Sequence, residues 1–322
     1  MNLALHEKEQ TPDSREIDLE ALDEILTGLK SSPKHISPKY FYDEYGSQLF
    51  DQITRLPEYY PTRTEVSILT RFDDEIAEIA GRGKVLLEPG AGNCSKVRHL
   101  LRALRPACYV PIDISRDYLF AAAAKLQQDF TDIPVFPIAD DMQSRVQLPP
   151  EMEGVPRLVF YPGSTIGNYT PERAVEFLRH IRSTIGEGGG LLIGVDLQKD
   201  AEILHSAYND VAGTTALFNL NSLNHINALT GASFNLSQFH HVAFYNEQSG
   251  RIEMHLESRI DQLVSLGDEL ISLTEGERIL TEYSYKYTLE GFAELAAEAG
   301  LAVQQQWTDD DDLFSLQFYS AV

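Results

Sequence analysis

The sequence predicts an α/β fold in which a doubly wound parallel sheet is accompanied by a second, smaller module. Short apolar runs alternate with helical periodicity from Lys84 onward, which is typical of a parallel sheet with helices on both faces. Several of these runs end in a carboxylate or a glycine-rich turn. The alternation is lost between residues 197 and 286, where polar, aromatic and Asn-rich segments indicate an inserted module.

The first predicted unit is a strand, a tight turn and a helix. Residues 84–88 form the strand, and the turn covers residues 89–95. The helix that follows has one apolar face, made of Val97, Leu100, Leu101 and Leu104. This spacing places the four side chains on the side that packs against a sheet.

The later elements repeat this pattern. Strands are predicted over residues 108–113, 135–138, 158–161 and 191–196, with a helix over residues 119–130. Thr170 and Pro171 supply an N-cap and a first-turn proline for a helix that reaches Ile185. The pattern returns at the Thr288 cap of a helix that Gly300 ends. Two final strands are predicted over residues 303–307 and 314–319.

The composition excludes several classes of function. The 322 residues include 26 Lys and Arg against 49 Asp and Glu, so the formal charge is −23. This charge repels nucleic acid phosphates and anionic lipid headgroups, so we expect neither nucleic acid nor membrane as a partner. No run approaches the roughly twenty apolar residues that a membrane helix needs, and the first residues contain no signal-peptide core. A cytoplasmic protein is expected.

The sequence gives no support for a metal site. The two cysteines, Cys94 and Cys108, form no CxxC pair and have no His at zinc-ligand spacing. His240 and His241 would point to opposite faces of a strand. The acidic run 309–312 lacks the alternating ligands and the glycine of a calcium loop, which favours a solvated turn.

A ligand of an open parallel sheet binds at the carboxyl ends of its strands. Here that rim would present Glu88, Gly90, Gly92, Asp113, Asp141, Gly163 and Asn168. Asp113 lies 21 residues after Gly92 at the end of its strand, where a carboxylate can accept hydrogen bonds from both ribose hydroxyls. A nucleoside cofactor is therefore the working hypothesis.

The glycine turn favours S-adenosylmethionine over a dinucleotide. A dinucleotide fingerprint needs a third glycine at position 95, where Ser95 stands, so an NAD-dependent oxidoreductase is the weaker alternative. A strand that ends in Glu88 before a Gly-x-Gly turn suits S-adenosylmethionine, which has no pyrophosphate to anchor at a helix N-terminus. Taken alone, the glycines are also compatible with a simple strand-to-helix turn.

Several separated motifs are more specific. They are SPKYFYDEYGS at 37–47, FDQITRLPEYYPTRTE at 50–65, GSTIGN at 163–168, AYND at 207–210, RIEM at 251–254 and LTEYS at 280–284. Together they resemble the ergothioneine-pathway histidine Nα-methyltransferases, and the resemblance covers nearly the whole chain after about residue 15. It implies a class I, Rossmann-like methyltransferase sheet, S-adenosylmethionine as methyl donor, L-histidine as substrate and no metal.

The resemblance also implies roles for individual residues. It places the substrate carboxylate against Asn168 and Tyr208, with Tyr42 near the reacting amine, so Tyr42 and Asn168 are the expected catalytic residues. The imidazole ring would meet Tyr59, Glu282 and Ser284, with Met254 in the same pocket. The cofactor would bind Gly90 and Lys96 through its methionine portion, Asp113 through its ribose, and Asp141 with the Met142 backbone through its adenine. Pro89, Ala91 and Met142 depart from the residues expected in this family.

The sequence is therefore interpreted as a cofactor-binding methyltransferase domain and a substrate-binding module. The domain comprises residues 65–196 and 287–322, and the module comprises residues 15–64 and 197–286. The expected function is trimethylation of the α-amine of L-histidine to hercynine, the first step of ergothioneine biosynthesis, by a monomer. An Nα-methyltransferase for another amino acid, such as tryptophan or tyrosine, is the alternative, and Glu282 argues against it because a buried carboxylate facing an apolar ring loses a partner. A noncatalytic cofactor-binding or amino-acid-binding module is a further alternative.

Overall fold

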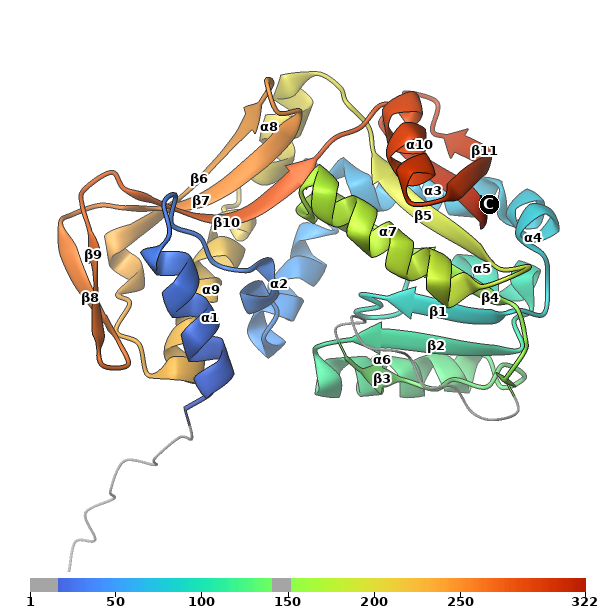
Figure 1. Ribbon diagram of the computed structural model, residues 1–322, viewed down its shortest axis with the longest axis horizontal. Helices are drawn as coiled ribbons and strands as arrows, with labels where there is room; N and C mark the ends of the chain where they lie inside the picture. The colour runs from blue at the N-terminus through green and yellow to red at the C-terminus, as the bar shows by residue number, and fades with distance from the viewer. Residues whose placement is uncertain (1–16, 141–151) are drawn as a thin grey trace, which may run out of the picture.

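The computed structural model describes residues 17–140 and 152–322, and Figure 1 shows two lobes. A seven-stranded sheet forms the core of the larger lobe. Its strands are β1 (Val85–Pro89), β2 (Cys108–Asp113), β3 (Ile138–Ala139), β4 (Arg157–Tyr161), β5 (Gly190–Asp196), β11 (Leu301–Thr308) and β12 (Phe314–Ala321). They are arranged in the order β11-β12-β5-β4-β1-β2-β3. Strands β1 to β5 pair in parallel, and β12 and β11 are antiparallel.

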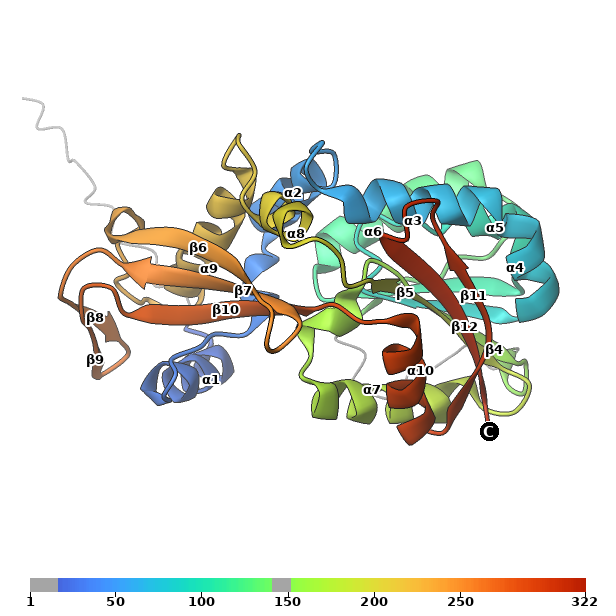
Figure 2. The same cartoon turned by 90° about the horizontal axis from the view of Figure 1, so that it is seen from above.

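Helices cover both faces of this sheet, as Figure 2 shows. One face packs against α3 (Tyr60–Arg71), α4 (Asp73–Ala80), α5 (Arg98–Leu104) and α6 (Arg116–Asp129), and the other against α7 (Pro171–Ile185) and α10 (Leu289–Glu298). Successive strand residues belong to opposite cores: Leu86 is in the first and Leu87 in the second. This burial on both faces explains the continuous apolar runs, and the predicted doubly wound α/β class is confirmed.

The predicted helix ends agree with the structure. The Thr170 side chain accepts a hydrogen bond from the Arg173 N–H at the start of α7, and Thr288 caps α10 through the Gly291 N–H. Gly300 follows α10 with a φ of +76°. Each of these ends is specified by residues within one turn of the helix, so local sequence is enough to predict it.

The predicted strand over residues 135–138 was wrong in its extent. Only β3 pairs there as a strand, and Val135 forms an isolated bridge with Tyr109. Pro134 and Pro137 lack the N–H that a ladder needs, so a continuous strand across residues 135–138 would leave hydrogen bonds unmade.

The smaller lobe contains an antiparallel sheet and a hairpin. The sheet has the order β10-β7-β6 and contains β6 (Phe239–Asn246), β7 (Arg251–Ser258) and β10 (Arg278–Tyr285). The hairpin pairs β8 (Gln262–Leu266) with β9 (Glu269–Leu273). The helical segments of this lobe are α1 (Leu19–Lys30), η1 (Pro38–Phe41), α2 (Glu44–Ile53), α8 (Ala201–Tyr208), α9 (Thr214–Thr230) and η4 (Leu236–Gln238). Apolar residues from α1, α9 and both sheets close its core.

In the described part of the chain, three segments connect the lobes: the start of α3, residues 197–200 between β5 and α8, and residues 286–288 between β10 and α10. Helix α3 runs through the predicted module boundary at residues 64 and 65, and its Ile68 and Leu69 pack in the core of the larger lobe. Strand β10 leads directly into α10. Among the described residues, no helix combines the length and the apolar character needed to cross a membrane.

Candidate active site

The order of the parallel strands reverses between β1 and β4, which is where open α/β sheets bind ligands. Gly90, in the loop after β1, has a φ of +66°, a conformation that favours glycine. Asp113 at the end of β2 accepts hydrogen bonds from the N–H groups of Gly92 and Ser115, each at 2.9 Å. Each carboxylate oxygen has a second lone pair for a ligand. Asp113 therefore fixes the glycine loop and can still accept hydrogen bonds at the rim.

Glu88 lies beneath the rim rather than on it. Its side chain is 1% exposed and accepts a hydrogen bond from the Tyr109 hydroxyl. Burial raises the pKa of Glu88 to about 8, against the opposing effects of that hydrogen bond and the Lys96 charge. The expectation that Glu88 faces the ligand was therefore wrong, because the sheet core encloses this strand on both sides.

A buried ion pair connects the loops that follow β1 and β4. Glu65 on α3 is fully buried, and its Oε2 lies 2.6 Å from Lys96 Nζ. The same carboxylate accepts hydrogen bonds from the Gly163 N–H at 2.9 and 3.0 Å. Glu65 thus holds both the Lys96 ammonium and the Gly163 loop at the point where the strand order reverses.

A pocket lies between this rim and the smaller lobe. Its wall includes all seven residues to which the sequence resemblance assigns catalysis or substrate binding: Tyr42, Tyr59, Asn168, Tyr208, Met254, Glu282 and Ser284. They come from η1, α3, α8, β7, β10 and the short helix η3 (Thr165–Asn168), or from residues adjoining them. Gly163, Ser164 and Thr165 complete the side toward the rim, and Phe50 and Phe218 add aromatic surface. Residues far apart in the sequence therefore meet at one site.

Three tyrosine hydroxyls in the pocket are neutral. Burial raises the pKa values of Tyr42, Tyr59 and Tyr208 well above 10, and nearby groups including Glu282 raise them further. A neutral phenol can donate one hydrogen bond and accept others. These side chains consequently offer polar contacts without adding negative charge.

Glu282 and Asn168 are in direct contact. The Asn168 Nδ2 donates to Glu282 Oε2 at 3.2 Å, and burial raises the pKa of Glu282 to about 7, against the Lys286 charge and this hydrogen bond. Gly167 permits the approach, because a Cβ there would lie 2.8 Å from the Tyr285 carbonyl oxygen. The pocket thus contains a carboxylate that titrates near neutral pH.

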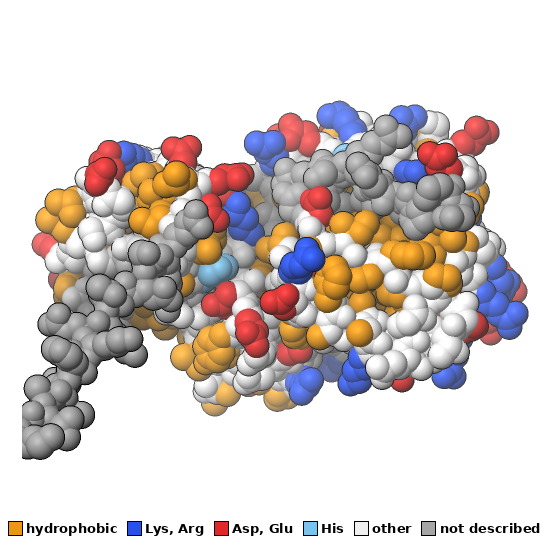
Figure 3. Space-filling view, turned by 90° about the horizontal axis from the view of Figure 1, so that it is seen from below, with side chains coloured by type: hydrophobic (Ala, Val, Ile, Leu, Met, Phe, Trp, Pro, Cys, Tyr) orange, Lys and Arg blue, Asp and Glu red, His pale blue; other side chains and the backbone are white. Residues whose placement is uncertain are grey.

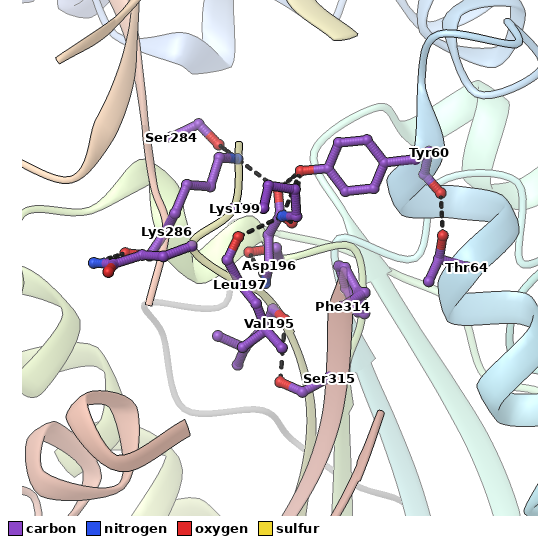
Figure 4. A network of polar contacts seen from close by, with 12 residues as sticks. Tyr60, Thr64, Val195, Asp196, Leu197, Lys199, Ser284, Lys286, Phe314 and Ser315 are labelled. Carbon is purple, nitrogen blue, oxygen red and sulfur yellow. Dashed lines mark hydrogen bonds and ion pairs between the residues drawn. The ribbon is translucent and has the colours of Figure 1, made fainter. Parts of the chain in front are cut away.

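Figure 4 shows a buried polar network, which includes Ser284 of the pocket wall. Asp196 at the end of β5 is 1% exposed and lies 2.6 Å from both Lys199 Nζ and Lys286 Nζ. The Tyr60 hydroxyl donates to the same carboxylate at 2.8 Å. Burial raises the pKa of Asp196, but the Lys286 and Lys199 charges outweigh it and keep the pKa below its ordinary value. Burial lowers the pKa of Lys199 to about 8.

Lys286 connects this network to the pocket. It also donates to Ser284 Oγ at 2.8 Å and to the Tyr208 hydroxyl at 3.2 Å. Lys286 was not among the residues predicted from the sequence, and Asp196 was predicted only as the end of a strand. The spacing of the sequence could have indicated Lys286, because residues 282, 284 and 286 lie on the same face of an extended segment.

His241 and His255 have structural partners. His241 contacts the Tyr208 carbonyl oxygen at 2.9 Å and Asn219 Nδ2 at 2.9 Å, and His255 lies 3.3 Å from Glu253. Within residues 17–140 and 152–322, no group of three or more His, Cys, Asp or Glu side chains is arranged to hold a metal ion. Of the predicted cofactor contacts, Gly90, Lys96 and Asp113 lie on the rim loops or beside them, whereas Asp141 and Met142 lie outside the described residues.

Comparisons with known proteins agree with the sequence motifs. Residues 21–321 match the family described as histidine-specific methyltransferase, SAM-dependent. The chain is 42% identical to the histidine N-alpha-methyltransferase of Mycolicibacterium smegmatis and 40% identical to that of Mycobacterium tuberculosis, in each case over 91% of this chain and 92% of the relative. It is also 32% identical to ergothioneine biosynthesis protein 1 of Neurospora crassa, over 87% of this chain and 32% of that longer protein.

Proposed function

Because the chain belongs to the family of histidine-specific, S-adenosylmethionine-dependent methyltransferases, we propose that it methylates the α-amine of L-histidine. Three transfers would yield hercynine, and the ergothioneine biosynthesis proteins among its relatives support a place at the start of that pathway. The observation that carries the proposal is the pocket. It gathers seven residues from separate motifs, with one titratable carboxylate among neutral hydroxyl and amide groups.

The rim residues fit the methyl donor. S-adenosylmethionine supplies an electrophilic methyl group on a positively charged sulfur. Lys96 offers an ammonium for the donor's carboxylate, and Asp113 offers lone pairs for its ribose hydroxyls. The Gly90 backbone allows close approach. Asp141 and Met142 remain the proposed adenine contacts, and no metal is proposed.

The pocket residues fit the amino acid. Asn168 and Tyr208 would donate to its α-carboxylate, and Glu282 would accept from an imidazole N–H. Tyr59, Met254 and Ser284 would enclose the ring. Tyr42 would stand beside the amine, and its backbone carbonyl is held by the Ser115 hydroxyl at 3.2 Å, next to the proposed ribose contact Asp113. Tyr42 and Asn168 would thereby align the amine with the donor, and such alignment supplies much of the rate of a two-substrate reaction.

The amine must be uncharged to attack the methyl carbon. A free α-amine has a pKa of about 8, so a substantial fraction is neutral without a strong base. Because the pKa of Tyr42 is raised well above 10, its phenol would orient the amine as a neutral hydrogen-bonding group. The α-ammonium would first lose its proton to water. The neutral nitrogen would then bond to the methyl carbon as the methyl–sulfur bond breaks, and S-adenosylhomocysteine would leave with that electron pair. Fixing the carboxylate and the ring at two ends would let the amine rotate between successive transfers.

The remaining aspects of the proposal concern the whole protein. We propose a cytoplasmic monomer, with its substrate-binding module in residues 15–64 and 197–286 and its methyltransferase domain in residues 65–196 and 287–322. Nucleic acid and membranes are not proposed partners. On the face that Figure 3 shows, the Lys and Arg side chains of the described residues are scattered among acidic and hydrophobic ones rather than forming a continuous basic surface.

Mass spectrometry would test the function directly. The purified protein is incubated with S-adenosylmethionine and an equimolar mixture of the twenty amino acids. Histidine carrying three methyl groups is the expected product. Methylation of tryptophan, tyrosine or another amino acid instead would overturn the substrate proposal, and cofactor binding without any methylated product would indicate a binding role.

A variant tests the assignment of Glu282 to the ring. Glu282→Leu removes the proposed acceptor for the imidazole N–H, so selectivity for histidine over other amino acids should fall. Glu257→Leu is the matched control, because Glu257 lies on β7 outside the pocket and pairs with Arg278. If Glu282→Leu selects histidine over other amino acids as strongly as the wild type does, Glu282 does not bind the imidazole ring.

A further inference from the structure

Lys286 is a buried cation immediately behind the pocket wall. It follows β10 directly and lies two residues beyond Ser284, which itself lies two residues beyond Glu282. Alternate residues of an extended segment point to the same side, so Lys286 continues the row that faces the pocket. Its side chain is 1% exposed, and it does not line the pocket itself.

The ammonium of Lys286 has three protons and three acceptors. Its Nζ lies 2.6 Å from Asp196 Oδ2, 2.8 Å from Ser284 Oγ and 3.2 Å from the Tyr208 hydroxyl oxygen. An ammonium group only donates hydrogen bonds. The Tyr208 and Ser284 oxygens therefore both act as acceptors toward Lys286, and each hydroxyl keeps its single proton for another partner.

Only one of those two protons has an acceptor among the described residues. The Tyr208 hydroxyl donates to Ser284 Oγ at 2.7 Å. Within the described part of the chain, no acceptor is found for the Ser284 proton, although this residue lines the pocket. A ligand acceptor can take the Ser284 proton directly, or the Tyr208 proton if that hydroxyl turns while Lys286 still binds Ser284.

We propose that Lys286 is a positioning residue that fixes the hydroxyls of Tyr208 and Ser284 as hydrogen-bond donors toward the amino-acid substrate. This rests on the proposed function, because it concerns binding of the amino acid that the pocket accepts. With both hydroxyls held as donors, this wall favours an acceptor such as a carboxylate oxygen or an unprotonated ring nitrogen. A ligand N–H at the same place would meet a second donor.

The chain offers a matched pair of lysines for the test. Lys199 and Lys286 both bind Asp196 at 2.6 Å, but only Lys286 also reaches Tyr208 and Ser284. In Lys286→Met, Asp196 keeps Lys199 and Tyr60 as partners, so the buried carboxylate does not become unpaired. Lys199→Met removes a similar charge while leaving the Lys286 contacts in place.

The experiment is a double-mutant cycle read by calorimetry. L-histidine is titrated into full-length protein saturated with S-adenosylhomocysteine, in the wild-type background and in the Tyr208→Phe/Ser284→Ala background. Lys286→Met should raise the dissociation constant at least tenfold in the first background and less than threefold in the second. This difference is expected because substitutions that act through the same hydrogen bonds have non-additive effects on the free energy of binding. Lys199→Met should change the constant less than threefold, and the affinity for S-adenosylhomocysteine should be unchanged in both lysine variants.

An equal effect of Lys286→Met in both backgrounds would overturn the proposal, as would no effect in the wild-type background. If Lys286→Met does not fold, Lys286→Gln replaces it, because an amide can both donate and accept and so cannot fix the two hydroxyls as donors. If the wild-type protein methylates a different amino acid, the proposed function fails, and the cycle is run with that amino acid. The two proposals therefore fail on separate measurements.

Discussion

Replacing Glu282 by Gln should make the protein more stable at alkaline pH while weakening its binding of substrate. Burial raises the pKa of Glu282 from an ordinary 4.5 to about 7. Between these values the folded state holds a proton that the unfolded state has released. The stabilisation from that proton is complete below pH 4.5 and is lost as the pH rises through 7.

The size of the effect follows from the width of this window. Each pH unit corresponds to about 1.4 kcal/mol, so the ionised carboxylate destabilises the fold by at most about 3.5 kcal/mol above pH 7. This is an upper bound because Glu282 faces the pocket and is partly solvated. Gln has the same shape, can accept from Asn168 and does not titrate.

Urea unfolding followed by circular dichroism measures the prediction. Wild type and Glu282→Gln are compared from pH 5.5 to 8.5, above the isoelectric point of about 4.7. The advantage of the variant in free energy of unfolding should grow by up to about 2 kcal/mol across this range. Glu257→Gln is the control, because the Arg278 hydrogen bond keeps the pKa of Glu257 below its ordinary value. If the free energies of unfolding of wild type and Glu282→Gln change in parallel with pH, the raised pKa of Glu282 is refuted.

The same titration should be visible in substrate binding. At pH 6 about a tenth of Glu282 is ionised, and at pH 8 about nine tenths, if its pKa is near 7. Histidine affinity should therefore gain up to about tenfold over this interval in the wild type, beyond any change seen in Glu282→Gln. The titration of free histidine is the same in both experiments, so the difference between the two proteins reports on Glu282.

Three other substitutions test separate parts of the site. Glu65→Gln should weaken binding of S-adenosylhomocysteine at least tenfold by calorimetry, because it removes the ion pair with Lys96; unchanged affinity would contradict this role. Asn168→Ala should raise the KM for histidine at least tenfold in steady-state assays with cofactor affinity retained, and wild-type kinetics would remove Asn168 from the site. Tyr60→Phe should lower the free energy of unfolding by about 1–3 kcal/mol, because Asp196 loses a buried hydrogen bond. In that variant kcat/KM should stay within twofold, and a large loss of activity with full stability would contradict the prediction.

Much of the larger lobe could be predicted from sequence because its signals are local. Strand β2 spans residues 108–113 as predicted, and α7 begins at the Thr170 cap and ends at Ile185 as predicted. Both depend on the chemistry of residues within a few positions. Apart from the strand expected at His240 and His241, the strands of the smaller lobe were not predicted, since inward positions such as Glu282 and Ser284 are polar and obscure the alternation expected of a half-buried strand.

The residues of the pocket could be proposed from motifs, but their supporting contacts could not. Glu65 meets the Gly163 N–H across 98 positions, and Lys286 meets Asp196 across 90. No local pattern indicates such pairs. Tyr59 and Tyr60 illustrate the difference: Tyr59 lines the pocket, whereas its neighbour is 1% exposed and binds Asp196. Their different places depend on how α3 begins.

The two sides of the site belong to different parts of the chain. Loops of the seven-stranded sheet present the Lys96 ammonium and the Asp113 carboxylate, while β7 and β10 present Met254 and Glu282. A substitution on the antiparallel strands can therefore alter the shape and polarity that an incoming amino acid meets while leaving the glycine loops intact. Under the proposed roles, this separation would let a few substitutions in the smaller lobe alter substrate specificity while the contacts to the methyl donor are inherited unchanged.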